Sequence, residues 1–245
     1  MAVKRILLTG AMGRIGQTFF RGCENDYAFT LVDIAPSDKG VSAPHRSVAF
    51  DLSDPKGLTK LCEGMDAIVH LAGVPSPDAE FDALLPANIL ATTHLLKAAH
   101  EAGCRRFVFA SSAQTIEGYP VDRQIVSGMA VAPANLYGVT KCYGEALCSY
   151  YATQKGMSCV ALRIGAFEPV EDHALTNARD LSAWLSPRDA VHLITRAIEA
   201  DIDGFFIGHG ISNNRFKRLD LTETRRVLGY APSDDAFATF DLPIP

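Results

Sequence analysis

Residues 4–16 read KRILLTGAMGRIG, in which a short apolar run with a charged start leads into three glycines spaced three residues apart. The helix-compatible residues QTFF follow at 17–20. A strand, a glycine turn and a helix in this order can cradle a phosphate. Gly10 permits the tight turn, Gly13 the approach of a pyrophosphate to the backbone, and Gly16 close packing of the helix on the strand. The free amides of the helix N-terminus suit the same ligand. The stretch therefore predicts a dinucleotide-binding turn.

An acid ends the second predicted strand, FTLVD at residues 29–33. At the carboxyl end of this strand, Asp33 can accept hydrogen bonds from the adenosine ribose hydroxyls. Its charge would repel a 2′-phosphate, which favours NAD over NADP. Arg14 and Lys39 are nearby basic residues that weaken this preference. The alternative interpretation of Asp33 is an ordinary turn aspartate, and that of the glycine turn is a strand–helix turn without a ligand.

A tyrosine and a lysine stand four residues apart in LYGVTK, residues 136–141. On a helix, Tyr137 and Lys141 project from the same face. A free tyrosine hydroxyl titrates near ~10, and a neighbouring ammonium favours its phenolate. The pair therefore predicts a tyrosine that acts as a base. Because both residue types are common on helices, the pair alone is weak evidence and gains weight from the glycine turn.

Composition bounds the class of partner. The 245 residues are 48% hydrophobic and carry a net charge of −5. This acidic balance offers no basic field for nucleic acid or an anionic membrane. No apolar run approaches the ~20 residues that span a bilayer. We therefore expect a small-molecule substrate, with neither nucleic acid nor membrane as a partner.

The cysteines and histidines give no metal-site pattern. Six cysteines show neither CxxC nor metal-finger spacing, so we interpret them as buried small residues of a cytoplasmic protein. The seven histidines form no HxxxH pair, and His70 and His94 lie in apolar runs. These two are expected to be hydrogen-bonded core residues, and no metal is predicted.

Strands and helices alternate along the chain, which predicts an α/β fold: a doubly wound parallel sheet covered on both faces. Further strands are expected at 47–51, 66–71, 106–110, 158–163 and 204–207. Helices are expected near 55–64, 81–102, 135–155 and 187–200, and a last helix from Asp220 to Gly229. Pro86 would mark a break in the helix at 81–102. We expect one domain, 1–245. Its nucleotide-binding core covers about 1–165, and substrate-binding segments with the last strand and helix cover 166–245.

A set of motifs runs through the chain in one order. They are the TGxxGxxG turn, Asp33, Asp51-Leu52, His70-Leu71-Ala72-Gly73, Asn88, Ser112, the YxxxK pair, Arg163-Ile164-Gly165 and the tail Leu228-Gly229-Tyr230-Ala231-Pro232. In this the chain resembles the extended short-chain dehydrogenases/reductases of the NAD-dependent epimerase/dehydratase family. The resemblance implies a Rossmann-type fold, NAD as cofactor and hydride transfer.

The resemblance also implies roles for individual residues. Tyr137 would be the base or acid, Lys141 would bind the nicotinamide ribose and lower the pKa of the tyrosine, and Ser112 would hydrogen-bond the reacting oxygen. The implied cofactor residues are Gly10, Met12, Gly13, Arg14, Ile15, Gly16, Asp33, Asp51, Leu52, Leu71, Ala72, Gly73, Asn88, Tyr137, Lys141 and Ile164. The implied substrate residues are Ser76, Ser112, Ala113, Gln114, Tyr137, Ala166 and Arg179.

Within this superfamily the short C-terminal part favours a small or monosaccharide substrate. The stretches 109–112, 136–145 and 181–189 resemble the uronate dehydrogenases, which oxidise C1 of glucuronate or galacturonate to an aldarolactone. Arg179 stands where those enzymes place the arginine that grips the sugar carboxylate, a task suited to a guanidinium. The alternative is a salt bridge from Arg179 to Asp180 or Glu171.

The chain also departs from the uronate dehydrogenases. Ala113 and Gln114 stand where Asn and His are expected, Ala166 replaces a Ser, and the loop 74–81 differs, although Ser76 can still contact a hydroxyl. These changes remove side chains that would hydrogen-bond sugar hydroxyls, and such hydrogen bonds determine which sugar a site accepts. The sequence therefore does not specify the exact sugar.

Three other functions compete with the uronate hypothesis. They are a dehydrogenase of another aldose, sugar phosphate or alcohol, an epimerase or dehydratase that retains its NAD, and a non-catalytic NAD-binding regulator. By analogy with related enzymes, the helices at 81–102 and 135–155 would pair in a homodimer or higher homo-oligomer.

Overall fold

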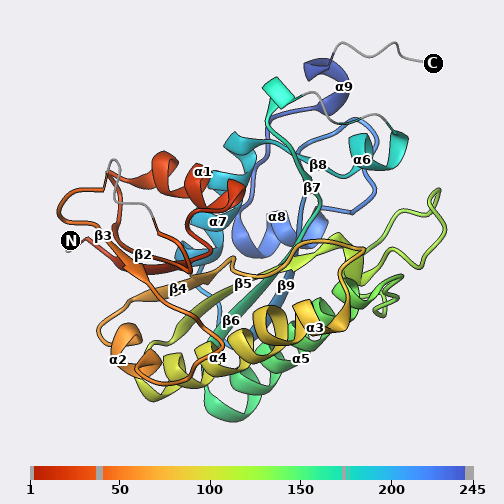
Figure 1. Cartoon of the computed structure of the whole chain (residues 1–245). Coiled ribbons are helices and arrows are strands. Elements are labelled where there is room, and N and C mark those ends of the chain that lie inside the picture. Colours follow the sequence, from red (N-terminus) through yellow and green to blue (C-terminus); the bar gives the residue numbers. More distant parts are fainter. Residues whose placement is uncertain (1–2, 37–40, 173–174, 176, 241–245) are drawn as a thin grey trace.

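The computed structural model describes residues 3–36, 41–172, 175 and 177–240. These form a parallel seven-stranded sheet in the order β3-β2-β1-β4-β5-β6-β9 (Figure 1). The strands are β1 (Arg5–Thr9), β2 (Ala28–Asp33), β3 (Arg46–Ala49), β4 (Ala67–His70), β5 (Arg106–Ser112), β6 (Ser158–Ile164) and β9 (Phe205–Gly210). The chain reverses its direction of travel across the sheet between β1 and β4, and ligands bind outside the carboxyl ends of strands at such a point. The doubly wound sheet is confirmed.

Helices cover both faces of the sheet (Figure 1). One face carries α1 (Arg14–Cys23), α7 (Pro187–Glu199) and α8 (Thr222–Leu228), and the other carries α2 (Leu58–Cys62), α4 (Ala91–Glu101) and α5 (Leu136–Lys155). Because the sheet is buried on both sides, its central strands are apolar without alternation, and every residue of β4 is buried. Two hydrophobic cores result, one around Phe19 and Phe29 and one around Leu95 and Phe107.

The helix predicted at 81–102 is present but changes its pitch at the proline. It begins as α3 (Phe81–Leu84), widens into a π-helical segment (Leu85–Leu90) and continues as α4. Pro86 has no N–H to donate to the preceding turn, and its own carbonyl accepts from the amide of Ala91. The expected break is therefore a widened turn, not an interruption.

A small cap stands over the carboxyl end of β6. We call it the cap: β7 (Ala166–Phe167), β8 (Trp184–Leu185), a 3-10 turn (Val170–Asp172), α6 (Ala178–Ser182) and α9 (Ala236–Thr239). Strands β7 and β8 pair in parallel. Trp184 is fully buried and donates its indole N–H to the carbonyl of Glu168 at 2.8 Å. This tryptophan packs with Leu181 and Ala236, which gives the cap a small core of its own.

The C-terminal part differs from the sequence prediction in one respect. Helix α8 ends at Leu228 and is capped by Gly229, which has the left-handed φ of 67°, and the carboxylate of Asp220 accepts from the amide of Thr222 at its start. However, α9 follows it, so α8 is not the last helix. The reason is that Asp235 caps this short helix through the amide of Phe237, while the helix packs on Trp184.

The predicted core residues behave as expected with two exceptions. Five of the six free cysteines are buried, and Cys142 is half-buried. His70 is hydrogen-bonded on both ring nitrogens, to Thr9 and Thr92. His94 was expected to be hydrogen-bonded as well, but its buried Nδ1 has no partner among the described residues.

The described residues hold neither a candidate metal site nor a candidate membrane-spanning helix. No group of three or more metal-ligating side chains comes together there. Likewise, none of the helices found in those ranges has the length and apolar character that crossing a membrane requires.

Gly144 sets how closely α5 approaches β5. A Cβ built at Gly144 would lie 2.2 Å from the Phe109 ring, a contact that requires the core to shift. We expect Gly144→Ala to lower the free energy of unfolding by about 1–3 kcal/mol because it overpacks the core. Urea denaturation measures the change. Gly128→Ala is the control, since a Cβ there meets nothing within 4 Å; equal stability of the two variants would contradict the packing argument.

Candidate active site

A cleft of about 1040 Å³ opens at the carboxyl ends of the central strands. It brings together residues that are distant in sequence, including the glycine turn, Asp33, Ser112, Tyr137 and Arg179. Every cofactor residue named from the sequence lines it except Asn88, and every substrate residue lines it except Ser76. The substrate end of the cleft is the part lined by Ser112, Ala113, Gln114, Ala166 and Arg179.

The glycine turn has the shape that a dinucleotide requires. Gly10 has a φ of +66°, and a Cβ there would lie 2.6 Å from the amide nitrogen of Ala72. A Cβ on Gly16 would lie 2.3 Å from the carbonyl of Gly10. Gly13 precedes α1 in an extended conformation and gives no side-chain cap, so the first amides of this helix face the cleft and can bind phosphate oxygens. The residues present therefore fit a pyrophosphate.

Asp33 is fixed at the end of β2 beside this turn. Its carboxylate accepts from the amide of Met12 at 2.9 Å and from that of Ile34 at 2.8 Å. Both bonds come from backbone amides, so the acid keeps its place when side chains move. This position suits a contact with ribose hydroxyls. Arg14, one of the two basic residues that weaken the NAD preference, is paired with Glu168 and Asp172, and Lys39 lies outside the described residues.

Asp51 and Leu52 line the same part of the cleft. The carboxylate of Asp51 accepts from the hydroxyl and the amide of Ser53, at 2.7 and 2.9 Å, and these bonds lower the pKa of Asp51. Leu52 is buried. Next to them, Leu71 and Ala72 continue from β4 and form the floor of the cleft.

Lys141 is a buried cation of the cleft. Its ammonium donates to the carbonyl of Ala110 at 2.8 Å and lies 5.0 Å from the Phe109 ring centroid and 5.6 Å from that of Tyr137. Burial lowers the pKa of Lys141 to about 8. The neighbouring His70 is also buried, which, together with the charge of Lys141, lowers the pKa of His70 to about 3 and keeps it neutral.

Tyr137 does not have the lowered pKa that the sequence predicted. Burial raises the pKa of this tyrosine, and a hydrogen bond with Ser112 offsets part of the effect. The ammonium of Lys141 donates to the carbonyl of Ala110. The expected lowered pKa is therefore wrong for Tyr137 in this structure, because burial outweighs the hydrogen bond with Ser112 that favours the phenolate.

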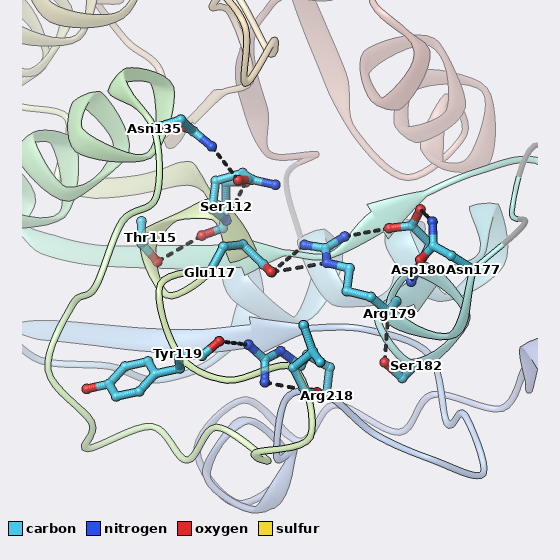
Figure 2. Close-up of polar contacts among 12 residues, drawn as sticks. Ser112, Thr115, Glu117, Tyr119, Asn135, Asn177, Arg179, Asp180, Ser182 and Arg218 are labelled. Atoms are coloured by element: carbon cyan, nitrogen blue, oxygen red, sulfur yellow. Dashed lines mark hydrogen bonds and ion pairs between the residues drawn. The ribbon is translucent and has the colours of Figure 1, made fainter.

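The start of α5 orients the substrate end, a contact that sequence reasoning missed. Asn135 caps the helix, with its Oδ1 accepting from the amide of Gly138 at 2.8 Å. Its Nδ2 therefore points outward and donates to Oε1 of Gln114 at 2.7 Å (Figure 2). The backbone amide of Gln114 donates to the Ser112 hydroxyl at 3.1 Å. The Asn-Leu-Tyr order at 135–137, a polar cap before a helix, was the available signal.

Arg179 lines the substrate end, but it is already paired. Its Nε donates to Glu117 at 3.1 Å, its Nη2 donates to the same oxygen, and its Nη1 donates to Asp180 at 2.8 Å (Figure 2). Burial alone would lower the pKa of Arg179, but the hydrogen bonds and charges of Glu117 and Asp180 outweigh it and raise the pKa. The salt bridge between Arg179 and Asp180, which was the predicted alternative, is thus present. The second carboxylate that pairs with Arg179 is that of Glu117, not that of Glu171.

Two residues named from the sequence lie outside the cleft. Asn88 is buried, and its side-chain amide bonds both backbone groups of Val74 and the hydroxyl of Thr140. It therefore holds the loop after Gly73. Ser76 accepts from the amide of Asp78 at 3.3 Å within its own turn.

Arg14 connects the glycine turn to the cap. Its guanidinium donates to Glu168 at 3.0 Å and to Asp172 at 2.6 Å. The hydrogen bond with Glu168 is the main reason that the pKa of Arg14 is raised. This link between the two halves of the cleft could not be read from local sequence.

Comparisons with known proteins agree with this geometry. Residues 6–187 match the NAD dependent epimerase/dehydratase family. The uronate dehydrogenase of Pseudomonas putida is 36% identical over 95% of this chain and 85% of its own. The NAD-dependent glucose-6-phosphate dehydrogenase of Haloferax volcanii is also 36% identical, over 94% of each chain. The crystal structure of uronate dehydrogenase from Agrobacterium tumefaciens has a TM-score of 0.88 and 33% identity, covering 100% of this chain and 91% of that one.

Asp33 provides a test of cofactor preference. We expect Asp33→Asn to weaken NAD binding and to lower the preference for NAD over NADP by about tenfold or more, because the variant loses a charged acceptor of the ribose hydroxyls and the repulsion of a 2′-phosphate. Titration of the protein with each dinucleotide measures both. Asp54→Asn, an exposed carboxylate outside the cleft, is the control, and an unchanged preference in Asp33→Asn would reject the assignment.

Proposed function

Because this chain belongs to the NAD-dependent epimerase/dehydratase family, we propose that it oxidises a hydroxyl-bearing carbon of a sugar, with NAD as the hydride acceptor. One observation carries the proposal: the hydroxyls of Tyr137 and Ser112 interact in the same cleft that holds the glycine turn, beside the buried ammonium of Lys141. A cleft built only to bind a nucleotide has no need of this group of side chains.

The mechanism follows from the position of these three side chains. Oxidised NAD supplies the hydride acceptor and a positive charge when it is bound. Gly10, Gly13 and Asp33 hold the dinucleotide through the turn and the ribose. Tyr137 takes the proton from the substrate hydroxyl, and Ser112 donates to the oxygen on which charge develops. Lys141, fixed by the Ala110 carbonyl, would hold the ribose of the nicotinamide.

Two classes of sugar fit this reaction. With a uronate, Tyr137 would accept the proton of the C1 hydroxyl of the pyranose, NAD would supply the acceptor for the C1 hydride, and the product would be an aldarolactone. The similarity to uronate dehydrogenases and the presence of Arg179 at the substrate end support this substrate. A neutral aldose undergoes the same chemistry to give an aldonolactone. It is supported by the pairing of Arg179 with two carboxylates of its own chain.

The sugar range would be established with a panel of glucuronate, galacturonate, glucose, galactose and arabinose, followed by the absorbance of NADH. Net NADH formation separates a dehydrogenase from an epimerase or dehydratase of the same family, which regenerates its NAD in each cycle. A protein that forms no NADH with any of these sugars or with small alcohols would overturn the proposed function.

Assembly as a homodimer is part of the same proposal. Leu90, Leu136, Val139 and Tyr150 are exposed apolar side chains on or next to the long helices α4 and α5. A second copy of the chain would cover them.

We expect Tyr137→Phe to lower kcat by about two to four orders of magnitude, because the variant lacks the general base. The affinity for NAD should stay within about threefold, since the glycine turn and Asp33 are unaltered. Steady-state kinetics and NAD titration measure the two quantities. Turnover equal to that of the parent protein would end the assignment of Tyr137 as the base.

We expect Ser112→Ala to move the acidic limb of the kcat/KM profile to higher pH. The hydrogen bond with Ser112 lowers the pKa of Tyr137, so its removal raises that pKa and reduces the phenolate fraction at neutral pH. The lost donor also costs about a hundredfold in rate. Ser149→Ala, farther along α5, is the control. A rate loss without a shift of the limb would show that Ser112 positions substrate without acting on the tyrosine.

A further inference from the structure

We propose that Glu117 neutralises Arg179 and thereby selects a neutral aldose over anionic sugars such as uronates and sugar phosphates. This inference rests on the proposed function. Neither Glu117 nor its contact with Arg179 was identified from the sequence.

The Glu117–Arg179 pair is not an ordinary surface salt bridge. Arg179 places Nε and Nη2 on one carboxylate oxygen of Glu117, and its Nη1 on Asp180. The side chains of Arg179 and Glu117 are 22% and 13% exposed. A guanidinium has five N–H groups, and these bonds take three of them. Screening by water is therefore weaker than for an exposed pair, and the two carboxylates outnumber the single cation.

Other cations of the cleft are committed elsewhere. Among the described residues that line it, Arg14 pairs with Glu168 and Asp172 at the cap, and Lys141 donates to the Ala110 carbonyl behind the tyrosine. Arg179 is therefore the cation that an anionic substrate would meet at the substrate end. Such a substrate must either displace Glu117 or accept the repulsion of two nearby carboxylates.

The loop that carries Glu117 is held rigidly to the catalytic strand. The hydroxyl of Thr115 donates to the carbonyl of Ser112 at 2.9 Å (Figure 2). The backbone of Ala132 then bonds the chain before and after Glu117. Its carbonyl accepts from the amide of Gly118 at 2.6 Å, and its amide donates to the carbonyl of Thr115 at 2.8 Å. Displacing the Glu117 carboxylate would work against this fixed loop. A neutral sugar, in contrast, can accept hydrogen bonds from Arg179 while the pair stays intact.

The test uses Glu117→Gln, which removes the charge and keeps an acceptor oxygen. We expect the ratio of kcat/KM for glucuronate to that for glucose to rise at least tenfold, which corresponds to about 1.4 kcal/mol. The parent protein should prefer glucose to both glucuronate and glucose 6-phosphate. Asp122→Asn, an exposed carboxylate on the same loop with no hydrogen bond or ion pair among the described residues, should leave the ratio unchanged.

Binding of the same sugars to the NADH-loaded protein is measured by calorimetry, because this complex cannot oxidise them and the result does not depend on turnover. Absence of NADH from every sugar would reject the proposed function, whereas the binding ratio still decides the role of Glu117. A parent protein that binds glucuronate more tightly than glucose would overturn this role, and so would a ratio that Glu117→Gln leaves unchanged. If Glu117→Gln does not fold, the preference of the parent protein alone decides.

Discussion

The site depends on one buried contact, in which the ammonium of Lys141 donates to the carbonyl of Ala110. A buried charged group is costly unless it is hydrogen-bonded, so the strand end and the helix are held in one relative position. Ser112 lies two residues beyond Ala110 on β5, and Tyr137 lies one helical turn before Lys141 on α5. The distance between the two reactive hydroxyls is therefore set by backbone elements, not by flexible loops.

Further contacts reinforce the same junction. Gly144 allows the Phe109 ring to approach α5. The next residue, Glu145, forms a buried ion pair with Arg163 of β6 and accepts from the hydroxyl of Ser111 on β5. Removing one member of a buried pair leaves an uncompensated charge, so this pair strongly resists separation of α5 from the two strands. Neither partner lines the cleft, and their effect on the reaction is to position Tyr137 and Ser112.

Sequence reasoning succeeded where the signal was local and failed where it was tertiary. The glycine turn and Asp33 could be predicted because their spacing follows from a strand–turn–helix unit, and Tyr137 and Lys141 because four residues make one helical turn. The Glu117–Arg179 pair joins residues 62 positions apart, and no periodicity relates them. The direction of the tyrosine pKa was wrong for a similar reason: it depends on where the Lys141 ammonium points and on burial, and spacing does not determine either. The short strands β7 and β8 of the cap were not predicted, since two-residue strands leave no pattern.

The substrate end has few side chains that can bind hydroxyls and several that carry charge. Ala113 and Ala166 present only methyl groups to the cleft, and a wall without donors or acceptors discriminates weakly between hydroxyl arrangements. Ion pairs, in contrast, connect its parts: Arg14 joins the glycine turn to the cap, and Arg179 joins the cap to the loop after Ser112. The charge presented to a substrate is thus set by residues that also hold the cap in place. A change of substrate charge would therefore have to alter a structural contact, which makes charge the property of the sugar that this architecture controls most firmly.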